Sequence, residues 1–289
     1  MSSTIETTSP HSSFPLSRLG FGGATIGLSN YLGRYDASSD ESRAEAIASV
    51  RKAVELGVNY IDTAPRYGNG LSEELIGIAL EGITTPLFIA TKVSLRDPTD
   101  LRVSLENSLK RLRRSSVDLV QLHGSSHNSE TIERVFQKGG VLDQMEAMKA
   151  DGLCRKIGFT TEDNNRATYD FIESGRFDAI QLAYNLLMQH PYEPTRPFGS
   201  LLEAKKRNML TITMRTATSG VFQRWVQMVN PQNTFDYTES LHQFVLSNKL
   251  VDVGLVGMRT EAVVEAAVSV WQNVAGRIDI DQLWNRFDA

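Results

Sequence analysis

Residues 58–92, VNYIDTAPRYGNGLSEELIGIALEGITTPLFIATK, contain the pattern from which the fold can be predicted. Residues 58–63 are mostly apolar and predict a strand, which a polar, glycine-containing segment ends. Residues 72–80 have the apolar spacing of a helix that Ser72 could cap, and Pro86 precedes a second apolar strand at residues 87–92. A strand, a helix and a strand in this order predict two parallel strands joined by a helix.

The same alternation continues on both sides of this segment. Further strands are predicted at residues 18–22, 117–123, 155–160, 179–184, 210–214 and 251–256. Further helices are predicted at residues 42–56, 100–112, 141–149, 164–174, 198–207, 238–248 and 261–269. Asp40 or Ser42 could cap the helix at 42–56, and Asp100 the helix at 100–112. Eight strand–helix repeats, with strands apolar on both faces, predict an α/β fold of the (β/α)8 (TIM) barrel class in one domain.

A doubly wound open sheet is the competing α/β architecture. Its first strand would be followed by a glycine-rich phosphate loop with the spacing G-x-G-x-x-G. Residues 20–27, GFGGATIG, do not have this spacing. The barrel is therefore preferred.

The terminal segments and the composition indicate the extent of the domain and the kinds of partner to expect. Residues 1–14 are polar and predict a loose N-terminal tail before a barrel at residues 15–289, and residues 280–287 predict a short closing helix. No signal segment and no apolar run of about 20 residues occur, and the net charge of −4 predicts neither nucleic acid nor membrane partners. Cys154 is the single cysteine, which fits a buried thiol and a cytoplasmic protein. The oligomeric state is left open.

Polar side chains end three consecutive predicted strands. Asp62 lies near the end of one strand and is followed by Tyr67, Lys92 ends the next, and His123 ends the third. The carboxyl ends of barrel strands share one rim, so these four side chains are expected to converge. An ammonium group favours a phenolate, a carboxylate keeps that ammonium charged, and an imidazole can orient a substrate oxygen. The set predicts proton exchange with an oxygen whose carbon exchanges hydride with a cofactor.

Other interpretations of these residues remain open. Asp62 and Lys92 could form a structural ion pair, and His123 could be a hydrogen-bonded structural residue. No metal site is predicted, because His123 and His127 flank a GSS segment that does not favour a helix and only Asp62 offers a third ligand. A Schiff-base lyase using Lys92 is the more serious alternative. A Schiff-base lysine must be neutral to attack, whereas Asp62 would keep it charged.

The segments DTAPRYGNGLSEELIG, IATK, LVQLHG, IGFTTED, AIQLAYN and VGLVGMRT occur in this order, and together they resemble the aldo-keto reductase family over residues 17–269. The resemblance is strongest to the branch of D-threo-aldose and L-galactose dehydrogenases. It implies Tyr67 as general acid and base, Lys92 as the group that lowers its pKa, Asp62 as the partner of Lys92, and His123 as the orienting residue. The implied activity is NAD(P)H-dependent interconversion of an aldehyde, ketone or aldose with its alcohol or lactone. A non-catalytic NADP-binding regulatory protein is the alternative within the family.

The resemblance also implies NADP(H), rather than NAD(H), bound across the rim. Gly22 and Gly23, which have no side chains, would let the cofactor approach the backbone closely. Gln181 would bind the nicotinamide amide, and Arg215 would stack on the nicotinamide ring. Arg259 would bind a 2′-phosphate. The remaining members of the implied cofactor site are Thr160, Thr161, Thr216, Gly257 and Thr260. Thr160–Thr161 replace the family's common Ser-Asn, and Arg215 replaces a common Tyr.

The loops that follow the strands are expected to shape a pocket for a small carbonyl or sugar substrate. Tyr31 and Trp225 would supply apolar walls. Arg66, beside Tyr67, could attract an anionic substrate or face the solvent.

Overall fold

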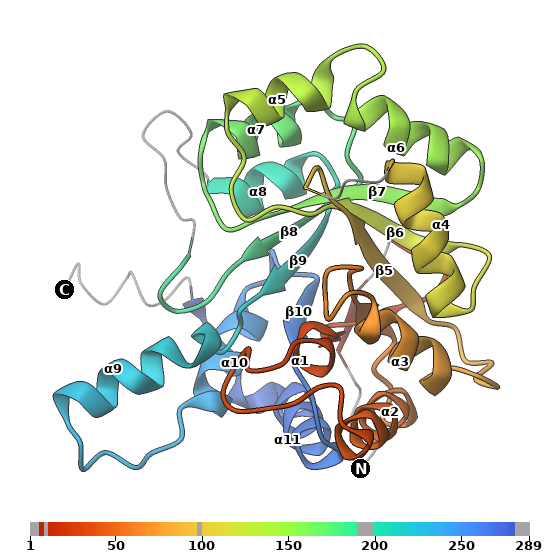
Figure 1. The fold of residues 1–289 in the computed structure, drawn as a ribbon. Coiled ribbons are helices and arrows are strands. Elements are labelled where there is room, and N and C mark those ends of the chain that lie inside the picture. Colours follow the sequence, from red (N-terminus) through yellow and green to blue (C-terminus); the bar gives the residue numbers. More distant parts are fainter. Residues whose placement is uncertain (1–5, 9–10, 97–99, 190–198, 281–289) are drawn as a thin grey trace, which may run out of the picture.

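The computed structural model describes residues 6–8, 11–96, 100–189 and 199–280, and these contain eight parallel strands in a closed barrel (Figure 1). In hydrogen-bonded order the strands are β3 (Leu19–Gly22), β4 (Tyr60–Asp62), β5 (Phe88–Val93), β6 (Val117–Leu122), β7 (Cys154–Thr161), β8 (Ala179–Ala183), β9 (Leu210–Met214) and β10 (Val253–Val256). β10 pairs with β3 and closes the ring. The predicted (β/α)8 barrel is confirmed.

Helices surround the barrel, and one of them follows each strand (Figure 1). They are α2 (Asp40–Glu55), α3 (Leu71–Ala79), α4 (Leu101–Leu112), α6 (Val141–Ala150), α7 (Arg166–Glu173), α8 (Gly199–Lys206), α10 (Thr238–Ser247) and α11 (Glu261–Gln272). The connections add elements that the sequence did not predict: α1 (Ala24–Gly27), α5 (Ser129–Phe136), η1 (Thr218–Gly220), α9 (Val221–Val229) and η2 (Val274–Gly276).

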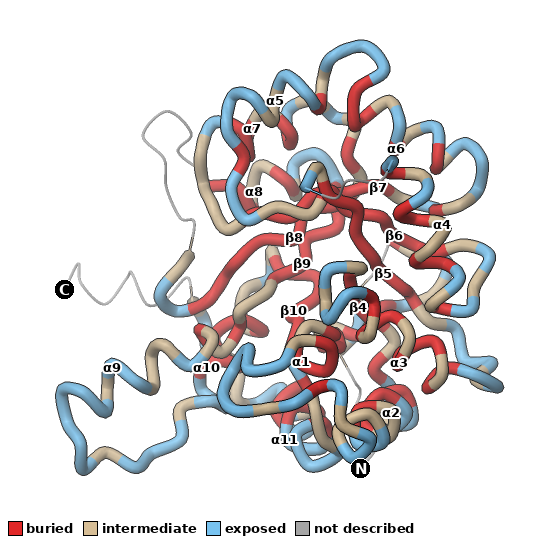
Figure 2. Tube along the Cα trace, in the orientation of Figure 1, coloured by how far each residue is buried: buried red, intermediate tan, exposed pale blue. Residues whose placement is uncertain are grey.

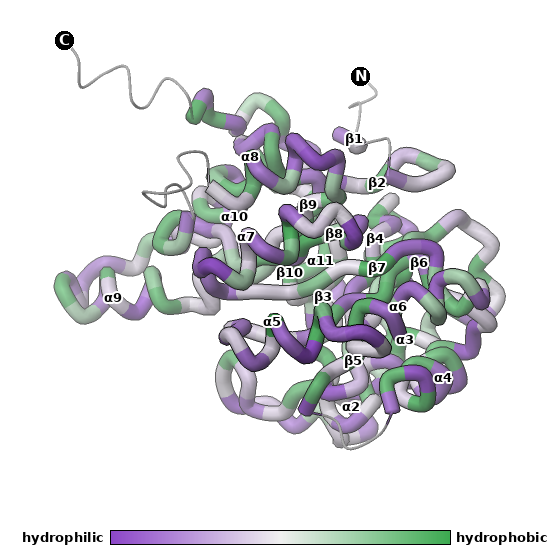
Figure 3. Tube along the Cα trace, turned by 90° about the horizontal axis from the view of Figure 1, so that it is seen from above, coloured by the Kyte–Doolittle hydropathy of each residue, from purple (hydrophilic) through white to green (hydrophobic). Residues whose placement is uncertain are grey.

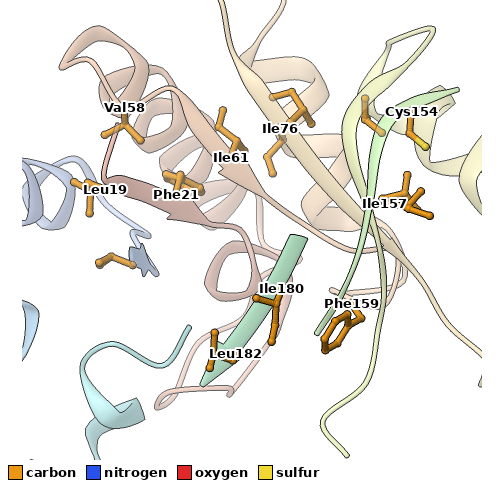
Figure 4. Packing of buried hydrophobic residues seen from close by; sticks show 14 of the residues in the cluster. Leu19, Phe21, Val58, Ile61, Ile76, Cys154, Ile157, Phe159, Ile180 and Leu182 are labelled. Carbon is orange, nitrogen blue, oxygen red and sulfur yellow. The ribbon is translucent and has the colours of Figure 1, made fainter. Parts of the chain in front are cut away.

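Side chains along each strand alternate between two apolar layers. Phe21, Ile61 and Ile157 belong to the larger layer, which lies between the strands and the helices (Figure 4). Tyr60 and Phe88 belong to the smaller layer, which fills the barrel. Figure 2 shows the strands buried along their length, while the helices expose their outer faces. A sheet buried on both sides explains why the strand sequences are apolar at successive positions.

Cys154 lies in the larger apolar layer, where it is 2% exposed (Figure 4). Burial raises the pKa of its thiol to about 12. The expectation of a buried thiol is confirmed, and a thiol that stays protonated is a poor nucleophile.

Two helix starts test the predicted caps. The Ser39 side chain accepts the backbone N–H of Ser42, so Ser39 caps α2. The prediction of Asp40 or Ser42 as the cap is wrong because both already lie in the first turn. Asp100 accepts backbone N–H groups at the start of α4, as predicted.

Ser72 does not cap α3, contrary to the prediction. The helix begins at Leu71, after Gly70 in the left-handed region with φ of 94°. Ser72 is fully buried, and its hydroxyl donates to the Gly23 carbonyl at 2.8 Å and lies 2.9 Å from the Thr63 hydroxyl. This serine therefore ties α3 to the strand ends β3 and β4.

Part of the segment expected to be a loose tail is paired in the structure. β1 (Thr7–Thr8) runs antiparallel to β2 (Leu16–Ser17). The Glu6 carboxylate pairs with Arg18 at 3.3 Å and with Arg277 at 2.9 Å. These contacts tie residues 6–8 to the rest of the described structure. Apart from residue 280, the helix predicted at residues 280–287 lies outside the described residues.

Candidate active site

A cavity of about 370 Å³ opens at the carboxyl ends of the barrel strands. Asp62, Tyr67, Lys92 and His123 all line it. Asp62 ends β4, Tyr67 lies in the following loop, Lys92 lies near the end of β5, and His123 directly follows β6. These strands are neighbours in the barrel, so the structure brings the four predicted residues together.

Lys92 and Asp62 form a buried ion pair. Lys92 is 1% exposed, and its Nζ donates to both Asp62 carboxylate oxygens at 2.7 Å and to the Thr63 carbonyl at 2.8 Å. Burial raises the pKa of Asp62 and lowers that of Lys92, and the attraction between the two charges opposes both shifts. Three acceptors match the three N–H donors of an ammonium group, which supports the charged form of Lys92.

Tyr67 is half-buried beside these charges. Lys92 Nζ lies 5.1 Å from the centroid of its ring, and the His123 ring lies edge-on to it at 5.8 Å. Burial and the Asp62 carboxylate hold the pKa of Tyr67 well above 10. The expected lowering by Lys92 is therefore wrong for this structure, because burial and the Asp62 carboxylate disfavour the phenolate more than the surrounding positive charges favour it. Tyr67 is a protonated phenol at neutral pH.

His123 is expected to remain neutral over the physiological pH range. Burial, followed by the charge of Lys92, lowers the pKa of its imidazole to about 3. An unfolded chain protonates histidine near pH 6.5, so this group destabilises the fold as the pH falls from about 6.5 toward 3. NMR titration of the histidine ring signals, with His123→Asn for assignment, should show no transition of this ring between pH 5 and 8. A transition near pH 6.5 would contradict the buried, neutral state.

Two glutamines continue the polar cluster, and only one of them, Gln181, was predicted from the sequence. Gln181 on β8 lines the cavity, whereas Gln121 on β6 does not. Gln121 Nε2 donates to Gln181 Oε1 at 2.9 Å and lies 3.3 Å from Asp62 Oδ1. A strand repeats its facing every second residue, so counting back two positions from His123 would have placed Gln121 on the interior face.

Six of the ten predicted cofactor residues line the cavity: Gly22, Thr160, Gln181, Arg215, Thr216 and Gly257. Thr160 does so with a hydroxyl that is already engaged. Its Oγ1 donates to the Gly124 carbonyl at 2.7 Å and accepts the Gly124 N–H at 2.9 Å. The hydroxyl thereby fixes the loop that follows His123.

The other four predicted cofactor residues do not line the cavity, and three of them have clear local roles. Gly23 allows close packing, since an added Cβ would lie 2.6 Å from Ser72 Oγ. Thr161 is buried, and its hydroxyl binds the backbone of Asp163. Thr260 caps α11. A structural role explains these three without a ligand.

Arg259 is the fourth. Its Nε donates to the Thr25 carbonyl at 2.9 Å, and its guanidinium carbon lies 4.2 Å from the centroid of the Tyr35 ring. Its Nη2 is buried and has no hydrogen-bond partner among the described residues. A buried N–H donor without a partner is costly, which marks this nitrogen as a candidate for binding an anion.

Arg215 is held in an unusual conformation at the end of β9. Its φ is 59°, in the left-handed region that residues other than glycine rarely adopt. Its guanidinium pairs at 2.8 Å with Glu162, which follows β7 and also lines the cavity. β8, which carries Gln181, lies between β7 and β9, so the ion pair joins the two neighbours of that strand. Glu162 was missed because a lone carboxylate in a loop gives no sequence signal.

The predicted substrate residues have different positions. Tyr31 lines the cavity with Leu28 and Leu32. Arg66 is exposed and does not line it. Trp225 is 55% exposed on α9, which extends with its loop away from the barrel in two views (Figures 1 and 3). The expectation that Trp225 forms a pocket wall is therefore corrected.

The described ranges contain no group of three His, Cys, Asp or Glu side chains suited to a metal ion. His127 instead binds the Thr160 carbonyl at 2.8 Å through Nε2. In the same ranges, no helix combines the length and apolar character that crossing a bilayer requires.

Comparisons with known proteins agree with this geometry. The profile of the Aldo/keto reductase family matches residues 18–273. L-galactose dehydrogenase of Arabidopsis thaliana is 31% identical over 147 residues, which cover 47% of this chain and 45% of that protein. Aldo-keto reductase YhdN of Bacillus subtilis is 35% identical over 161 residues, which cover 46% of each chain. The chain thus spans about half the length of these curated relatives.

A solved structure extends the similarity to the whole barrel. An aldo-keto reductase from Klebsiella pneumoniae, solved in complex with NADPH, superposes with a TM-score of 0.71 at 18% identity. The superposition covers 98% of this chain and 94% of that one. With a family profile that matches most of its length, this chain belongs to the aldo/keto reductase family.

Proposed function

We propose that this protein is an NADP(H)-dependent oxidoreductase that interconverts a small aldehyde, ketone or aldose with the corresponding alcohol or lactone. The observation that carries the proposal is the convergence of Tyr67, Lys92, Asp62 and His123 on one cavity that Gln181 also lines. The similarity to L-galactose dehydrogenase supports an aldose among the candidate substrates. We expect the protein to act in the cytoplasm.

The residues around the cavity fit a nicotinamide dinucleotide. Gln181 offers an amide for the nicotinamide carboxamide, and Gly22 and Gly257 leave backbone accessible at the rim. The unpartnered Nη2 of Arg259 suits a 2′-phosphate. Bound there, the nicotinamide would supply or accept the hydride.

The protein's own groups handle the proton. In the reducing direction, Tyr67 donates its phenolic proton to the carbonyl oxygen, and it accepts that proton back in the oxidising direction. Neutral His123 can donate a ring N–H to the same oxygen and fix its direction. Lys92 stabilises the phenolate that Tyr67 leaves behind, because its positive charge lies 5.1 Å from the ring.

Schiff-base chemistry at Lys92 is less well supported by the same contacts. All three N–H donors of the ammonium are engaged by Asp62 and Thr63, and the side chain is 1% exposed. A nucleophilic lysine needs a free, neutral amine. Borohydride trapping of a carbonyl substrate on Lys92 would favour the lyase.

A regulatory protein that binds NADP(H) without turning over a substrate is the second alternative. The wild-type protein should bind NADPH, which a change in NADPH fluorescence would measure. It should also oxidise NADPH when aldehydes and aldoses are tested as substrates. Tight NADPH binding with no turnover across the panel would favour the regulatory role instead.

Arg259→Met is expected to weaken NADPH binding by roughly ten-fold to a hundred-fold, as the loss of a charge-assisted hydrogen bond predicts. The Kd for NADH, which has no 2′-phosphate, should change little. Fluorescence titration with both nucleotides measures the two constants. An equal loss for NADPH and NADH would contradict the role of Arg259 in choosing between them.

A further inference from the structure

Gln121 is a fully buried side chain of the active site that does not reach the cavity. Its backbone lies opposite Lys92 on β5 and Gly158 on β7. Its amide nitrogen bridges Asp62 Oδ1 at 3.3 Å and Gln181 Oε1 at 2.9 Å. The amide thus joins the ion pair on one side of the barrel to the predicted cofactor ligand on the other.

The direction of the Gln121 amide is fixed by its neighbours. An ionised Asp62 only accepts hydrogen bonds, and the facing atom of Gln181 is its amide oxygen. Rotating the Gln121 amide by half a turn would set its oxygen against both of these oxygens. Its nitrogen must therefore face them, which leaves Gln121 Oε1 buried and without a partner among the described residues.

The orientation of the Gln121 amide in turn fixes the orientation of the Gln181 amide. Because Gln181 Oε1 accepts from Gln121, its Nε2 is the atom left for other contacts. That nitrogen lies 3.8 Å from Met214 Sδ, a weak acceptor, and the Gln181 amide also interacts with the Asp62 carboxylate. Both Gln181 and Met214 line the cavity. Gln181 is therefore held as a donor, ready for an oxygen acceptor such as a carboxamide oxygen.

We propose that Gln121 is a positioning residue that fixes the Gln181 amide as a donor for the cofactor and holds Asp62 in place for proton transfer. The inference rests on the proposed function, since it assigns Gln121 a role toward the same cofactor and reaction. One buried amide would therefore affect two measurable quantities: the affinity for the cofactor, and the acid limb of the profile of kcat/KM against pH.

Gln121→Met keeps the length of the side chain and removes both hydrogen bonds. We expect the Kd for NADPH to rise by about five-fold to ten-fold, the range of a neutral hydrogen bond. Besides Gln121, Asp62 interacts with Lys92, with the Gln181 amide, and with the phenols of Tyr60 and Tyr67. Losing a donor disfavours its ionised form, so the acid limb of kcat/KM against pH should move to higher pH.

The double variant Gln121→Met/Gln181→Met tests whether Gln121 acts through Gln181. It should bind NADPH no more weakly than Gln181→Met alone, since the two changes remove one shared arrangement. Independent, multiplying losses of affinity would overturn the proposal. Gln121→Glu offers a second route if the methionine variant does not fold: a protonated glutamic acid keeps one of the two hydrogen bonds, so its losses should be smaller.

Gln243→Met is the matched control for a purely structural effect. Gln243 is also buried and does not line the cavity, and its amide donates to the carbonyls of Val270 and Asn273. It should lower the Tm and leave the Kd and the pH profile unchanged. The same pattern in Gln121→Met would overturn the inference. If wild type binds NADPH but turns over no carbonyl, the proposed function fails, while the Kd comparisons still decide the role of Gln121.

Discussion

Tyr67→Phe is expected to lower kcat by roughly a thousand-fold, the middle of the range for removing a general acid. The variant keeps the ring that packs edge-on against His123 at 5.8 Å and removes only the oxygen that carries the proton. Because no partner of the ring is lost, the Kd for NADPH should stay within about two-fold of wild type. Steady-state kinetics at saturating NADPH and fluorescence titration measure the two effects separately.

Tyr184→Phe is the matched control. Its phenol accepts a hydrogen bond from Asn248 at 2.9 Å and does not line the cavity. This variant should keep its turnover and lose at most about a kilocalorie per mole of stability, as for one hydrogen bond. Turnover retained by Tyr67→Phe would refute the assignment of the proton to Tyr67.

Lys92→Met is expected to combine loss of turnover with a lower free energy of unfolding. It removes the partner of Asp62, which is 3% exposed and would be left as an unpaired buried charge. Breaking one partner of a buried ion pair typically costs about 3–5 kcal/mol. Urea unfolding followed by circular dichroism gives the change in stability, and the midpoint should fall clearly below that of wild type.

The double variant Lys92→Met/Asp62→Leu separates stability from activity. Replacing both charges with apolar groups removes the unpaired carboxylate, so most of the lost stability should return. Turnover should not return, because Tyr67 then has no nearby charge to stabilise its phenolate. An unchanged urea midpoint in Lys92→Met would mean that Asp62 is hydrated and that the ion pair is not a buried one.

The barrel could be predicted because apolar strands and amphipathic helices alternate with clear boundaries. Asp100 and Cys154 behaved as predicted because their roles depend on local sequence and on an apolar neighbourhood. Ser72 did not cap its helix, because the helix begins one residue earlier, at Leu71, and the Ser72 hydroxyl donates instead to the Gly23 carbonyl, 49 positions earlier in the chain. The pairing of Thr7–Thr8 with Leu16–Ser17 was missed because a two-residue strand has no periodicity to detect.

The candidate site was predictable only in part. Strand ends brought Asp62, Lys92 and His123 together as expected, since topology alone decides which side chains share a rim. The pKa of Tyr67 was predicted with the wrong sign, because residue types do not reveal how strongly burial disfavours the charged phenolate. Trp225 was misplaced because its segment was expected to be a loop over the pocket, whereas it forms α9, on which Trp225 is exposed.

The two-residue alternation along the strands separates the reaction from the framework that supports it. Inward-facing positions of β4, β5 and β6 carry Asp62, Lys92 and Gln121. The alternate positions on these strands, such as Ile61, pack against the helices. Substitutions that retune substrate choice or acidity can therefore accumulate at every second residue without loosening the outer shell. For protein engineering, this makes the inward-facing positions a separable library, to be varied together while their outward-facing neighbours are held constant.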